Sequence, residues 1–181
     1  MHYHLIKVGS NYIGVVVECK NKKMKIKKIY LPTGRKKMLQ RIKKDCPEIE
    51  RAPRELSGRL KRTIVALYQG KKQKFSRSML DVSNLTPFTK KVLLQASRIP
   101  RGQVVSYSSL AAKAGYPRAA RAVGRIMACN PFPIVIPCHR VINSDGSWGG
   151  FSGGWKMKRE MLKREGVEIC PEGKIVFRKR S

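Results

Sequence analysis

The sequence predicts a two-domain α/β (α+β) protein, with a small N-terminal antiparallel sheet and its helices followed by a mostly helical C-terminal domain that contains a helix-turn-helix. Three observations support this. Residues 2–31 are rich in β-branched and alternating apolar residues. Residues 35–70 contain two segments of helical periodicity. From Thr86 onward, short helical segments alternate with prolines and glycines.

The first strands are expected in the segments HYHLIKV, YIGVVVEC and KMKIKKIYL. Gly9-Ser10-Asn11 and Asn21-Lys22-Lys23 separate them and are short enough for hairpin turns. Pro32 and Gly34 should end the sheet. These segments predict a three-stranded antiparallel sheet.

Two helices should complete the N-terminal domain. RKKMLQRIKKDC has apolar residues at helical spacing, and an irregular stretch bounded by Pro47 and Pro53 follows it. ELSGRLKRTIVALYQG predicts a second helix, which Gly70 ends. KKQKFSRSMLDVSNL has the composition of a linker with short extended pieces. We therefore expect an N-terminal α/β domain at residues 1–80.

The C-terminal domain is expected at residues 86–170, with a basic tail at 171–181. Its first helix has Thr86 as N-cap and Pro87 at the first helical position. PFPIVIPCHRVI is punctuated by prolines and predicts an extended or looped segment. DGSWGGFSGGW predicts a glycine-rich loop, and a last helix should end at Gly166.

The spacing of Ser106–Gly115 and Pro117–Cys129 predicts a helix-turn-helix. The second helix begins PRAARAVGR, in which small side chains separate basic ones. Small residues allow a helix to approach a surface closely, and arginines bind phosphates or bases. Simple packing against a neighbouring helix is the alternative. The candidate DNA-binding residues are Arg118, Ala119, Ala120, Arg121 and Arg125.

The net charge is +29, with 40 Lys and Arg against 11 Asp and Glu. Charge of this size favours a polyanionic partner, and nucleic acid is the most common one. An anionic membrane surface is a weaker alternative, because no segment is clearly amphipathic with bulky apolar anchors. A general solubility effect is the other alternative.

Several compositional features indicate a soluble protein of the cytoplasm. No apolar run approaches the roughly 20 residues of a membrane span, and the N-terminus lacks a signal-peptide pattern. The five cysteines are odd in number and form no C-x-x-C pair, which argues against disulfides and structural zinc. His2 and His4 could hold a metal with Cys19, but a plain strand end is the favoured interpretation, and we predict no metal site.

Cys138 and His139 are the candidate chemical centre. A thiol becomes a useful nucleophile only as a thiolate, which needs a nearby cation or base. Neighbouring side chains of an extended strand point in opposite directions, so a bridging water or a bent backbone would have to connect the two. A carboxylate could orient the imidazole. The alternative is a buried structural cysteine. The acids available between Cys138 and the tail are Asp145, Glu160, Glu165 and Glu168.

Four segments carry a resemblance to a known family. They are PCHRVI, the preceding CNP at residues 129–131, the helix with RAVG and the segment GGFSGGWKMKREMLKREG. Together they resemble the O6-alkylguanine-DNA alkyltransferases. The resemblance covers Pro87 to Gly166 nearly without gaps, and PCHR in this context is its most specific part. The N-terminal half is only generally compatible with the small α/β domain of that family.

The resemblance implies that Cys138 accepts the alkyl group from O6 of guanine. It implies that His139 deprotonates the thiol through a water and that Glu165 holds His139. Asn130 is implied as a hinge whose hydrogen bonds shape the site. Tyr107 is implied to displace the DNA backbone and to donate a proton toward N3 of the leaving guanine.

The resemblance also implies that Arg121 fills the gap left by an extruded nucleotide, with the second helix of the helix-turn-helix in the minor groove. In the base pocket, the Val141 backbone reads the base, Ser152 contacts O6 and Lys158 forms part of the wall. Phe151 stands where many relatives have tyrosine, so a hydroxyl contact is lost there.

The resemblance therefore implies DNA repair by direct reversal, with each molecule acting once on O6-alkylguanine, or on O4 of thymine, in double-stranded DNA. No cofactor is needed for this chemistry, and we expect a monomer that does not bind membranes. A DNA-binding regulator or lesion sensor without chemistry is the alternative, although the non-transferring relatives lack the cysteine that this chain has at Cys138. A cysteine hydrolase is a weaker alternative, because such an enzyme has no evident use for a net charge of +29.

Overall fold

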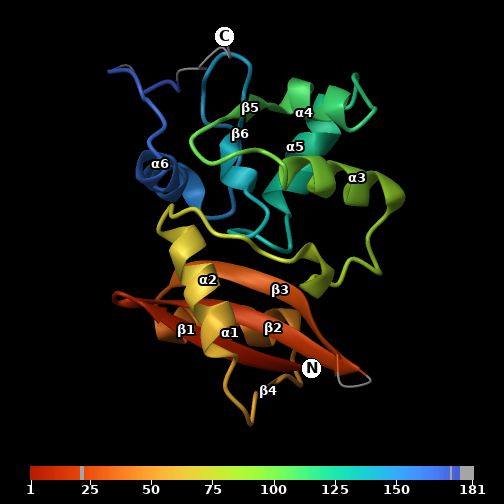
Figure 1. The fold of residues 1–181 in the computed structure, drawn as a ribbon, viewed down its shortest axis with the longest axis vertical. Coiled ribbons are helices and arrows are strands. Elements are labelled where there is room, and N and C mark those ends of the chain that lie inside the picture. The colour runs from red at the N-terminus through yellow and green to blue at the C-terminus, as the bar shows by residue number, and fades with distance from the viewer. Residues whose placement is uncertain (21–22, 172, 176–181) are drawn as a thin grey trace.

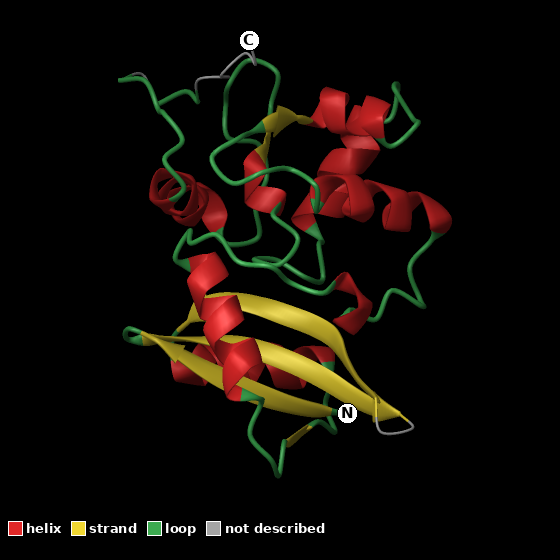
Figure 2. Ribbon diagram, viewed as in Figure 1, coloured by secondary structure: helices red, strands yellow, loops and turns green. Residues whose placement is uncertain are grey.

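The protein has its four-stranded sheet at one end and most of its helices at the other, where a short two-stranded sheet also lies (Figures 1 and 2). The structure, a computed structural model, describes residues 1–20, 23–171 and 173–175. The strands are β1 (His2–Val8), β2 (Asn11–Lys20), β3 (Lys23–Thr33), β4 (Glu50–Arg51), β5 (Val105–Ser106) and β6 (Val141–Ile142). The helices are α1 (Arg35–Asp45), α2 (Gly58–Tyr68), α3 (Pro87–Ala96), α4 (Tyr107–Lys113), α5 (Ala120–Ala128) and α6 (Gly154–Arg164), with short 3-10 helices η1 (Arg77–Met79) and η2 (Cys138–Arg140). The predicted mixed α/β fold is confirmed.

The N-terminal sheet has the strand order β3-β2-β1-β4. Its three long strands pair antiparallel, as the alternation predicted, and Gly9 turns the first hairpin with φ 59°. The second predicted turn includes residues 21–22, which lie outside the described residues. One prediction was wrong, because β4 lies in the stretch expected to be irregular and pairs parallel with β1. Two paired residues are too short a segment to show an alternating pattern.

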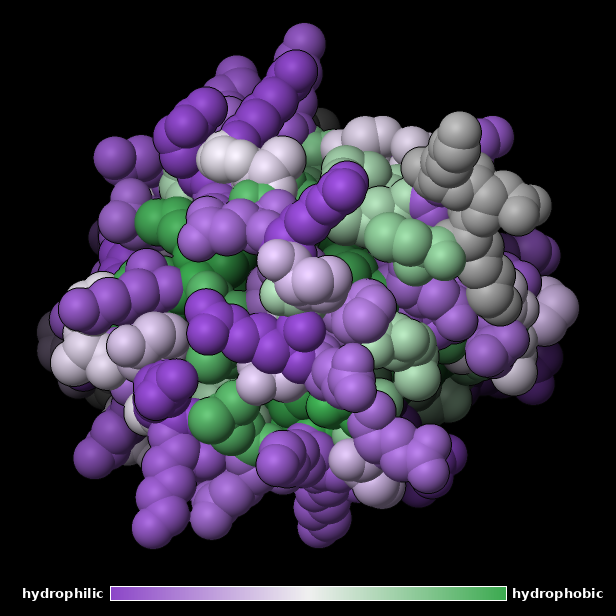
Figure 3. Space-filling view, turned by 90° about the horizontal axis from the view of Figure 1, so that it is seen from below, coloured by the Kyte–Doolittle hydropathy of each residue, from purple (hydrophilic) through white to green (hydrophobic). Residues whose placement is uncertain are grey.

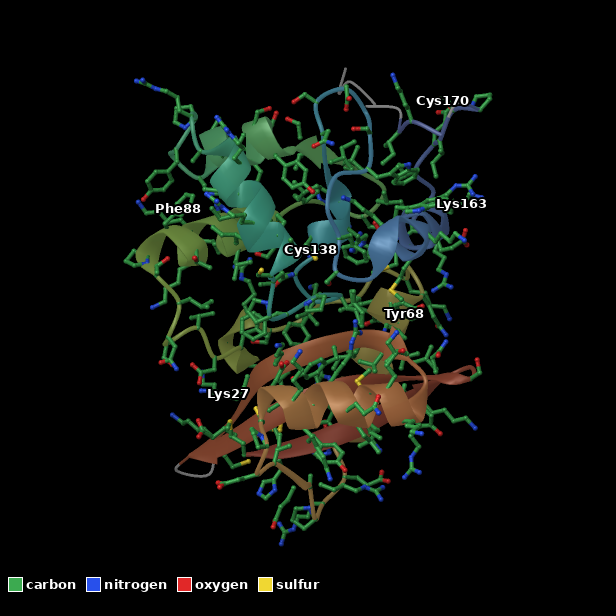
Figure 4. All side chains as sticks on the ribbon, turned by 180° about the vertical axis from the view of Figure 1, so that it is seen from behind. Lys27, Tyr68, Phe88, Cys138, Lys163 and Cys170 are labelled. Atoms are coloured by element: carbon green, nitrogen blue, oxygen red, sulfur yellow. The ribbon has the colours of Figure 1, made fainter. Side chains whose placement is uncertain are left out.

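One face of the sheet is covered by α1, which crosses the strands in the view from behind (Figure 4). Met38 and Ile42 of the helix pack against Val16 and Tyr30 of the sheet. Gly14 permits this close approach, since a Cβ there would lie 2.7 Å from the Met38 sulfur. The helix that the apolar spacing predicted therefore buries its apolar face on the sheet.

The other face of the sheet packs against α2 and the C-terminal half. Val15 and Ile29 share one apolar core with Leu60 of α2 and with Val92 of α3. The β3 edge is also bound, since the Ile29 N–H donates to the Pro131 carbonyl at 2.8 Å and Ile26 accepts from the Asp81 N–H at 2.8 Å. These bonds place β3 beside the loop that leads to η2 and leave that sheet edge less open to other chains.

The helices of the C-terminal half begin at capping residues. The Thr86 hydroxyl accepts from the Thr89 N–H at 3.2 Å, and the Ser106 hydroxyl accepts from the Ser109 N–H at 3.0 Å. The helix expected from Pro117 begins instead at Ala120. The reason is a turn, closed by a 2.9 Å hydrogen bond from the Ala119 N–H to the Tyr116 carbonyl, which redirects the chain first.

The surface at the sheet end of the molecule is dominated by long hydrophilic side chains, with hydrophobic surface visible between them (Figure 3). Among the described residues, no helix combines the length and the apolar character that crossing a membrane requires. Nor do the described residues bring three or more His, Cys, Asp or Glu side chains together in a metal-binding group.

Candidate active site

Cys138 lies at the start of η2, near the middle of the helical half of the protein (Figure 4). The segment was predicted to be extended or looped, and the 3-10 turn is a departure from that prediction. The turn leads into β6, which pairs parallel with β5 at Val105 and Val141. Cys138 and His139 are 2% and 1% exposed. A turn replaces the extended backbone at this point, so the strand rule of opposed neighbours does not apply to Cys138 and His139.

Glu165 holds the ring of His139. It lies just beyond the last residue of α6, and its Oε1 is 3.0 Å from His139 Nε2. Arg140 donates to the same carboxylate through Nε to Oε2 at 2.8 Å and through Nη2 to Oε1 at 2.7 Å. The sequence left four acids open as partners of the imidazole, and the structure brings Glu165 to it.

The charges of this group follow from burial and hydrogen bonding. Burial alone would raise the pKa of Glu165, but the hydrogen bonds from His139 and Arg140 outweigh it and lower the pKa to about 2. Burial lowers the pKa of His139 despite the carboxylate beside it. At neutral pH, a neutral imidazole therefore faces an ionised carboxylate. Nε2 carries the proton toward Glu165, and Nδ1, which is buried and has no hydrogen-bond partner among the described residues, is left as an acceptor.

The Cys138 thiol is protonated in this environment. Burial raises its pKa, while a hydrogen bond with the Asn130 side chain and the charge of Lys158 act in the opposite direction. The burial effect is the larger of these. A reaction at the sulfur therefore needs a base, and the neutral imidazole of His139 can act as one.

Lys158 is a fully buried cation on α6. Its Nζ donates to the Val141 carbonyl at 2.6 Å and to the Trp148 carbonyl. Burial lowers its pKa to about 8, although Cys138 acts to raise it. The ammonium group also lies 5.8 Å from the centre of the Tyr107 ring. No carboxylate among the described residues pairs with it, so its charge acts on the Cys138 thiol.

Tyr107, the first residue of α4, is also largely buried, and its hydroxyl donates to the Gly150 carbonyl at 3.2 Å. Burial and the nearby Cys138 raise its pKa to about 12, so the hydroxyl keeps its proton and remains a donor. Gly149 is required next to this ring. A Cβ there would lie 2.6 Å from the Tyr107 hydroxyl oxygen, and the backbone has φ 61°.

Asn130 fixes the loop that precedes Cys138. Its Nδ2 donates to the Ile136 carbonyl at 3.0 Å, and its Oδ1 accepts from the Phe132 N–H at 2.9 Å. Ile134, inside this loop, has φ 76°, which is rare for a β-branched residue. The Asn130 side chain therefore bonds to the backbone on both sides of Ile134, whose conformation is unfavourable on its own.

A cavity of about 460 Å³ opens between α5 and the glycine-rich loop. Four predicted site residues line it, namely Tyr107, Ala120, Arg121 and Arg125. The exposed Arg118 and the half-buried Ala119 precede α5 and do not line it. The candidate DNA-binding residues are thus split between the cavity wall and the turn before the helix.

The remaining predicted residues lie around this site in different ways. Val141 is buried and contributes its carbonyl to Lys158. Phe151 is half-buried against the main core. Ser152 is exposed and lines a neighbouring cavity of about 450 Å³ beside Asn130. The structure therefore does not place Ser152 in the cavity that Tyr107 lines.

Two residues of the site received no role from the sequence. Arg140 was noted only as part of the PCHR motif, yet it fixes Glu165. Gly149 was one of several glycines in a loop, and only its distance to Tyr107 distinguishes it. Proximity to Cys138 in the motif could have indicated Arg140, while no signal in the sequence alone could have separated Gly149 from its neighbours.

Comparison with known proteins points to one family. The family described as "6-O-methylguanine DNA methyltransferase, DNA binding domain" matches residues 87–167. A methylated-DNA--protein-cysteine methyltransferase of Methanothermobacter thermautotrophicus is 46% identical over 95 residues, which cover 52% of this chain and 53% of that protein. The protein of that name from Homo sapiens is 51% identical over 87 residues, 48% of this chain and 42% of the relative. The matched part spans about half the length of these relatives.

Solved structures match over nearly the whole chain. OGT of Mycobacterium tuberculosis, solved in complex with DNA, has a TM-score of 0.71 and 28% identity, and the match covers 91% of this chain and 92% of that one. The O6-methylguanine-DNA methyltransferase of Pyrococcus kodakaraensis has a TM-score of 0.68 and 26% identity, with 92% and 99% covered. These matches confirm the predicted two-domain fold. Residues 87–167 therefore match the DNA-binding domain of the 6-O-methylguanine DNA methyltransferases, and the chain as a whole shares the fold of OGT of Mycobacterium tuberculosis.

Proposed function

We propose that this protein repairs DNA by moving a methyl or other alkyl group from O6 of guanine to the Cys138 sulfur. The observation that supports this best is the arrangement around the thiol. A buried cysteine follows a loop fixed by Asn130, and the next residue is a neutral His139 whose Nε2 is held by an ionised Glu165. Such a group can generate a thiolate at the moment of reaction. O4 of thymine is a second target of the same chemistry.

The reaction balances with the groups present and a water as the carrier between them. His139 Nδ1 takes the thiol proton through a water, and the sulfur attacks the alkyl carbon. The bond from that carbon to O6 breaks, and its electron pair goes to the guanine. Tyr107, which keeps its proton because its pKa is raised to about 12, donates toward N3 of the leaving base. The product is a thioether, which water does not cleave, so each molecule acts once.

Double-stranded DNA is the partner in this proposal. The O6 atom of guanine is stacked inside the duplex, so the nucleotide must rotate out to reach the sulfur. Arg121 lies exposed on the rim of the cavity that Tyr107 lines, where it can fill the space that the nucleotide leaves. Arg118 and Arg125 are exposed nearby and suit phosphate contacts, which a protein acting at any sequence needs. The small residues of α5 suit approach to the minor groove.

The base pocket follows from the same proposal. Val141 and Phe151 contribute the backbone and the aromatic wall that read the extruded base, and Lys158, whose Nζ donates to the Val141 carbonyl, forms part of the wall. Ser152 would contact O6 only if the glycine-rich loop moves it from its exposed position toward the site.

The two halves have separate roles. We assign residues 1–80 to a supporting α/β domain and residues 86–170 to the DNA-binding and transfer domain. The hydrogen bond between Ile29 and Pro131 supports a bracing role for the sheet, because it holds the loop before Cys138. The basic tail at 171–181 includes residues 172 and 176–181, which lie outside the described residues. The working unit is a monomer.

The test uses duplex DNA that carries O6-methylguanine with a labelled methyl group. We expect the label to move to the protein and to stop at one methyl per molecule, and mass spectrometry should place it on Cys138. Cys138→Ala should bind the duplex and transfer nothing. Cys129→Ala, a change at an exposed cysteine at the end of α5, is the matched control and should transfer normally.

Two results would contradict this function. One is label that stays on the DNA in the presence of stoichiometric folded protein. The other is turnover well beyond one methyl per molecule. A footprint of the wild type at one undamaged sequence, with no transfer, would assign the protein to DNA-binding regulators instead.

A further inference from the structure

A second cavity, of about 320 Å³, lies on another part of the helical half. It is here called the rear groove because it lies on a different face from the cavity at α5. Three chain segments form it, at residues 67–77, 97–101 and 134–140. Its basic lining residues are Lys71, Lys72, Arg77, Arg98, Arg101 and Arg140. No Asp or Glu is among the residues that line it. The groove therefore concentrates positive charge with no anion of its own.

Backbone and hydroxyl oxygens hold several of these cations in place. Arg101 donates to the Gly70 carbonyl and, through Nη2, to the Arg164 carbonyl at 3.0 Å. Arg77 Nη1 donates to the Ser97 hydroxyl at 3.0 Å. These partners orient the guanidinium groups and leave their positive charge unneutralised. Within the described part of the chain, Arg140 alone of these cations has a carboxylate partner, Glu165.

Apart from Glu165, which pairs with Arg140, the acids of the described ion pairs lie at other sites. These pairs join Asp81 and Glu18 to Lys27 at 2.6 and 3.6 Å, Asp45 to Lys28 at 2.5 Å, and Glu55 to Lys61. With 11 acids for 40 Lys and Arg, a site where five cations converge without a described carboxylate partner is costly through mutual repulsion. A bound polyanion removes that cost, and successive phosphates of a nucleic-acid backbone match an extended groove of arginines and lysines.

The rear groove and the cavity at α5 share no lining residue. The helix α3 lies in front of α5 in Figure 1 and behind it in Figure 4, so α5 presents its outer side to the back view. The linker after α2 and the chain after α3, which carry the groove cations, run on the front side in Figure 1. A duplex lying along α5 therefore occupies a different face from the groove.

We propose that the rear groove binds the phosphate backbone of a second DNA segment, so that one molecule can bridge two segments while α5 holds the first. This inference rests on the proposed function for the site at α5 and adds a second binding face to it. Bridging keeps the protein near DNA when one contact is released, which helps it to move between segments during a search.

The experiment is a capture assay with the full chain and two undamaged short duplexes. One duplex is fixed to beads and loaded with protein, and a fluorescent duplex is added after washing. We expect the wild type to capture the fluorescent duplex in complexes that contain one protein molecule, as counted by mass photometry after release. Lys72→Glu with Arg98→Glu should weaken capture at least tenfold. Both side chains are exposed, and neither forms a side-chain hydrogen bond with another described residue.

The matched control is Arg51→Glu with Arg54→Glu, which lowers the net charge equally at the β4 end of the molecule. This control should capture like the wild type. Both double variants should keep alkyl transfer and binding of a single duplex. For the second duplex, the slope of log K against log salt should shrink by about 1.8 in the groove variant, for two lost phosphate contacts.

Several outcomes would overturn the groove. These are a wild type that transfers alkyl groups but captures no second duplex, a groove variant that captures as well as the wild type, a control that loses capture to the same extent, and capture only by complexes with two protein molecules. Each leaves the proposed function standing as long as transfer persists. Absence of transfer from the wild type contradicts the proposed function whatever the capture assay shows.

Discussion

Arg140 and Glu165 are joined by two parallel hydrogen bonds, from Nε to Oε2 at 2.8 Å and from Nη2 to Oε1 at 2.7 Å. The same Oε1 lies 3.0 Å from His139 Nε2. A third guanidinium donor, Nη1, reaches the Ile99 carbonyl at 2.6 Å. The arginine is thus fixed to the backbone, the carboxylate to the arginine, and the imidazole to the carboxylate. Arg140 acts as a positioning residue for the base.

Arg140→Lys should slow alkyl transfer about tenfold at neutral pH. A lysine keeps the charge but has no planar fork, so it cannot hold both oxygens of Glu165. Single-turnover transfer should show the loss, and the pH profile of the rate should shift with it. Binding of undamaged duplex should stay the same, and an equal loss of DNA binding would point to misfolding or to a role of Arg140 in DNA contact.

Glu165 should make the stability of the fold depend on acid. Its pKa is lowered from 4.5 to about 2, so the ionised carboxylate stabilises the fold above pH 4.5, and this contribution is lost as the pH falls toward 2. The shift corresponds to about 3 kcal/mol. Urea unfolding at pH 5 and at pH 2 should show this extra loss in the wild type and not in Glu165→Gln.

The lowered pKa of His139 also makes the fold less stable in acid, but at higher pH than Glu165 does. Burial lowers it below 6.5, so the unfolded chain binds this proton first, and stability declines as the pH falls through 6.5. The same shift keeps the base neutral in mild acid. The acid limb of the transfer rate should therefore lie below pH 6.5, and a limb above that value would contradict the assignment of His139.

Lys158→Met should slow transfer at pH 7, and the rate should recover as the pH rises. The buried ammonium lowers the pKa of the Cys138 thiol, so its removal leaves less thiolate at a given pH, by about tenfold for each pKa unit. Alkylation of Cys138 by iodoacetamide across pH values measures this pKa directly. Lys156→Met, at an exposed position of the same helix, is the control and should leave the profile in place.

Gly149→Ala should reduce transfer at least tenfold through Tyr107. The new Cβ would lie 2.6 Å from the tyrosine oxygen at a backbone φ of 61°, so the ring must move. Gly150→Ala is the matched control, because a Cβ there meets nothing within 4 Å. Transfer rates of both variants, with their melting temperatures, separate the displaced ring from general destabilisation. Equal rates for the two variants would refute the role of this contact.

Arg121→Ala should weaken repair of duplex DNA more than reaction with free O6-benzylguanine. The side chain lines the cavity at α5, and filling the gap in the stack matters only when a nucleotide leaves a duplex. Rates on the two substrates give the comparison. Similar losses on both would show that Arg121 serves the chemistry or the pocket and not extrusion.

The sequence predicted the long strands and helices well, because each carries a period that burial imposes. The apolar positions of the first helix meet the sheet as their spacing required, through Met38 and Ile42. The predicted start of α5 at Pro117 was wrong, because a proline there is compatible with a helix start and also with the turn that Ala119 closes. The parallel pairing of β4 depends on a partner far along the chain, which local pattern cannot indicate.

For the site, the motif located Cys138 and His139, and the resemblance placed Glu165, Tyr107 and Asn130, each of which the structure brings to the same region. Their roles remain predictions until they are measured. The 3-10 turn at Cys138 was not predicted, because the prolines before it are equally compatible with an extended segment, although local hydrogen bonds close it, such as the one from the Arg140 N–H to the Pro137 carbonyl at 3.0 Å. The contacts of the Arg140 side chain with Glu165 and Ile99 join residues far apart in the chain, so they can be seen only once the chain is folded.

The apolar core that joins Val15 of the sheet to Val92 of α3 has a practical consequence for anyone who shortens this chain. A fragment limited to residues 87–167 would carry the whole matched domain, but it would expose to water the apolar surface that the sheet covers in the full chain. Such a fragment should aggregate or need detergent to stay soluble. Adding residues 1–80 as a separate polypeptide should restore its solubility.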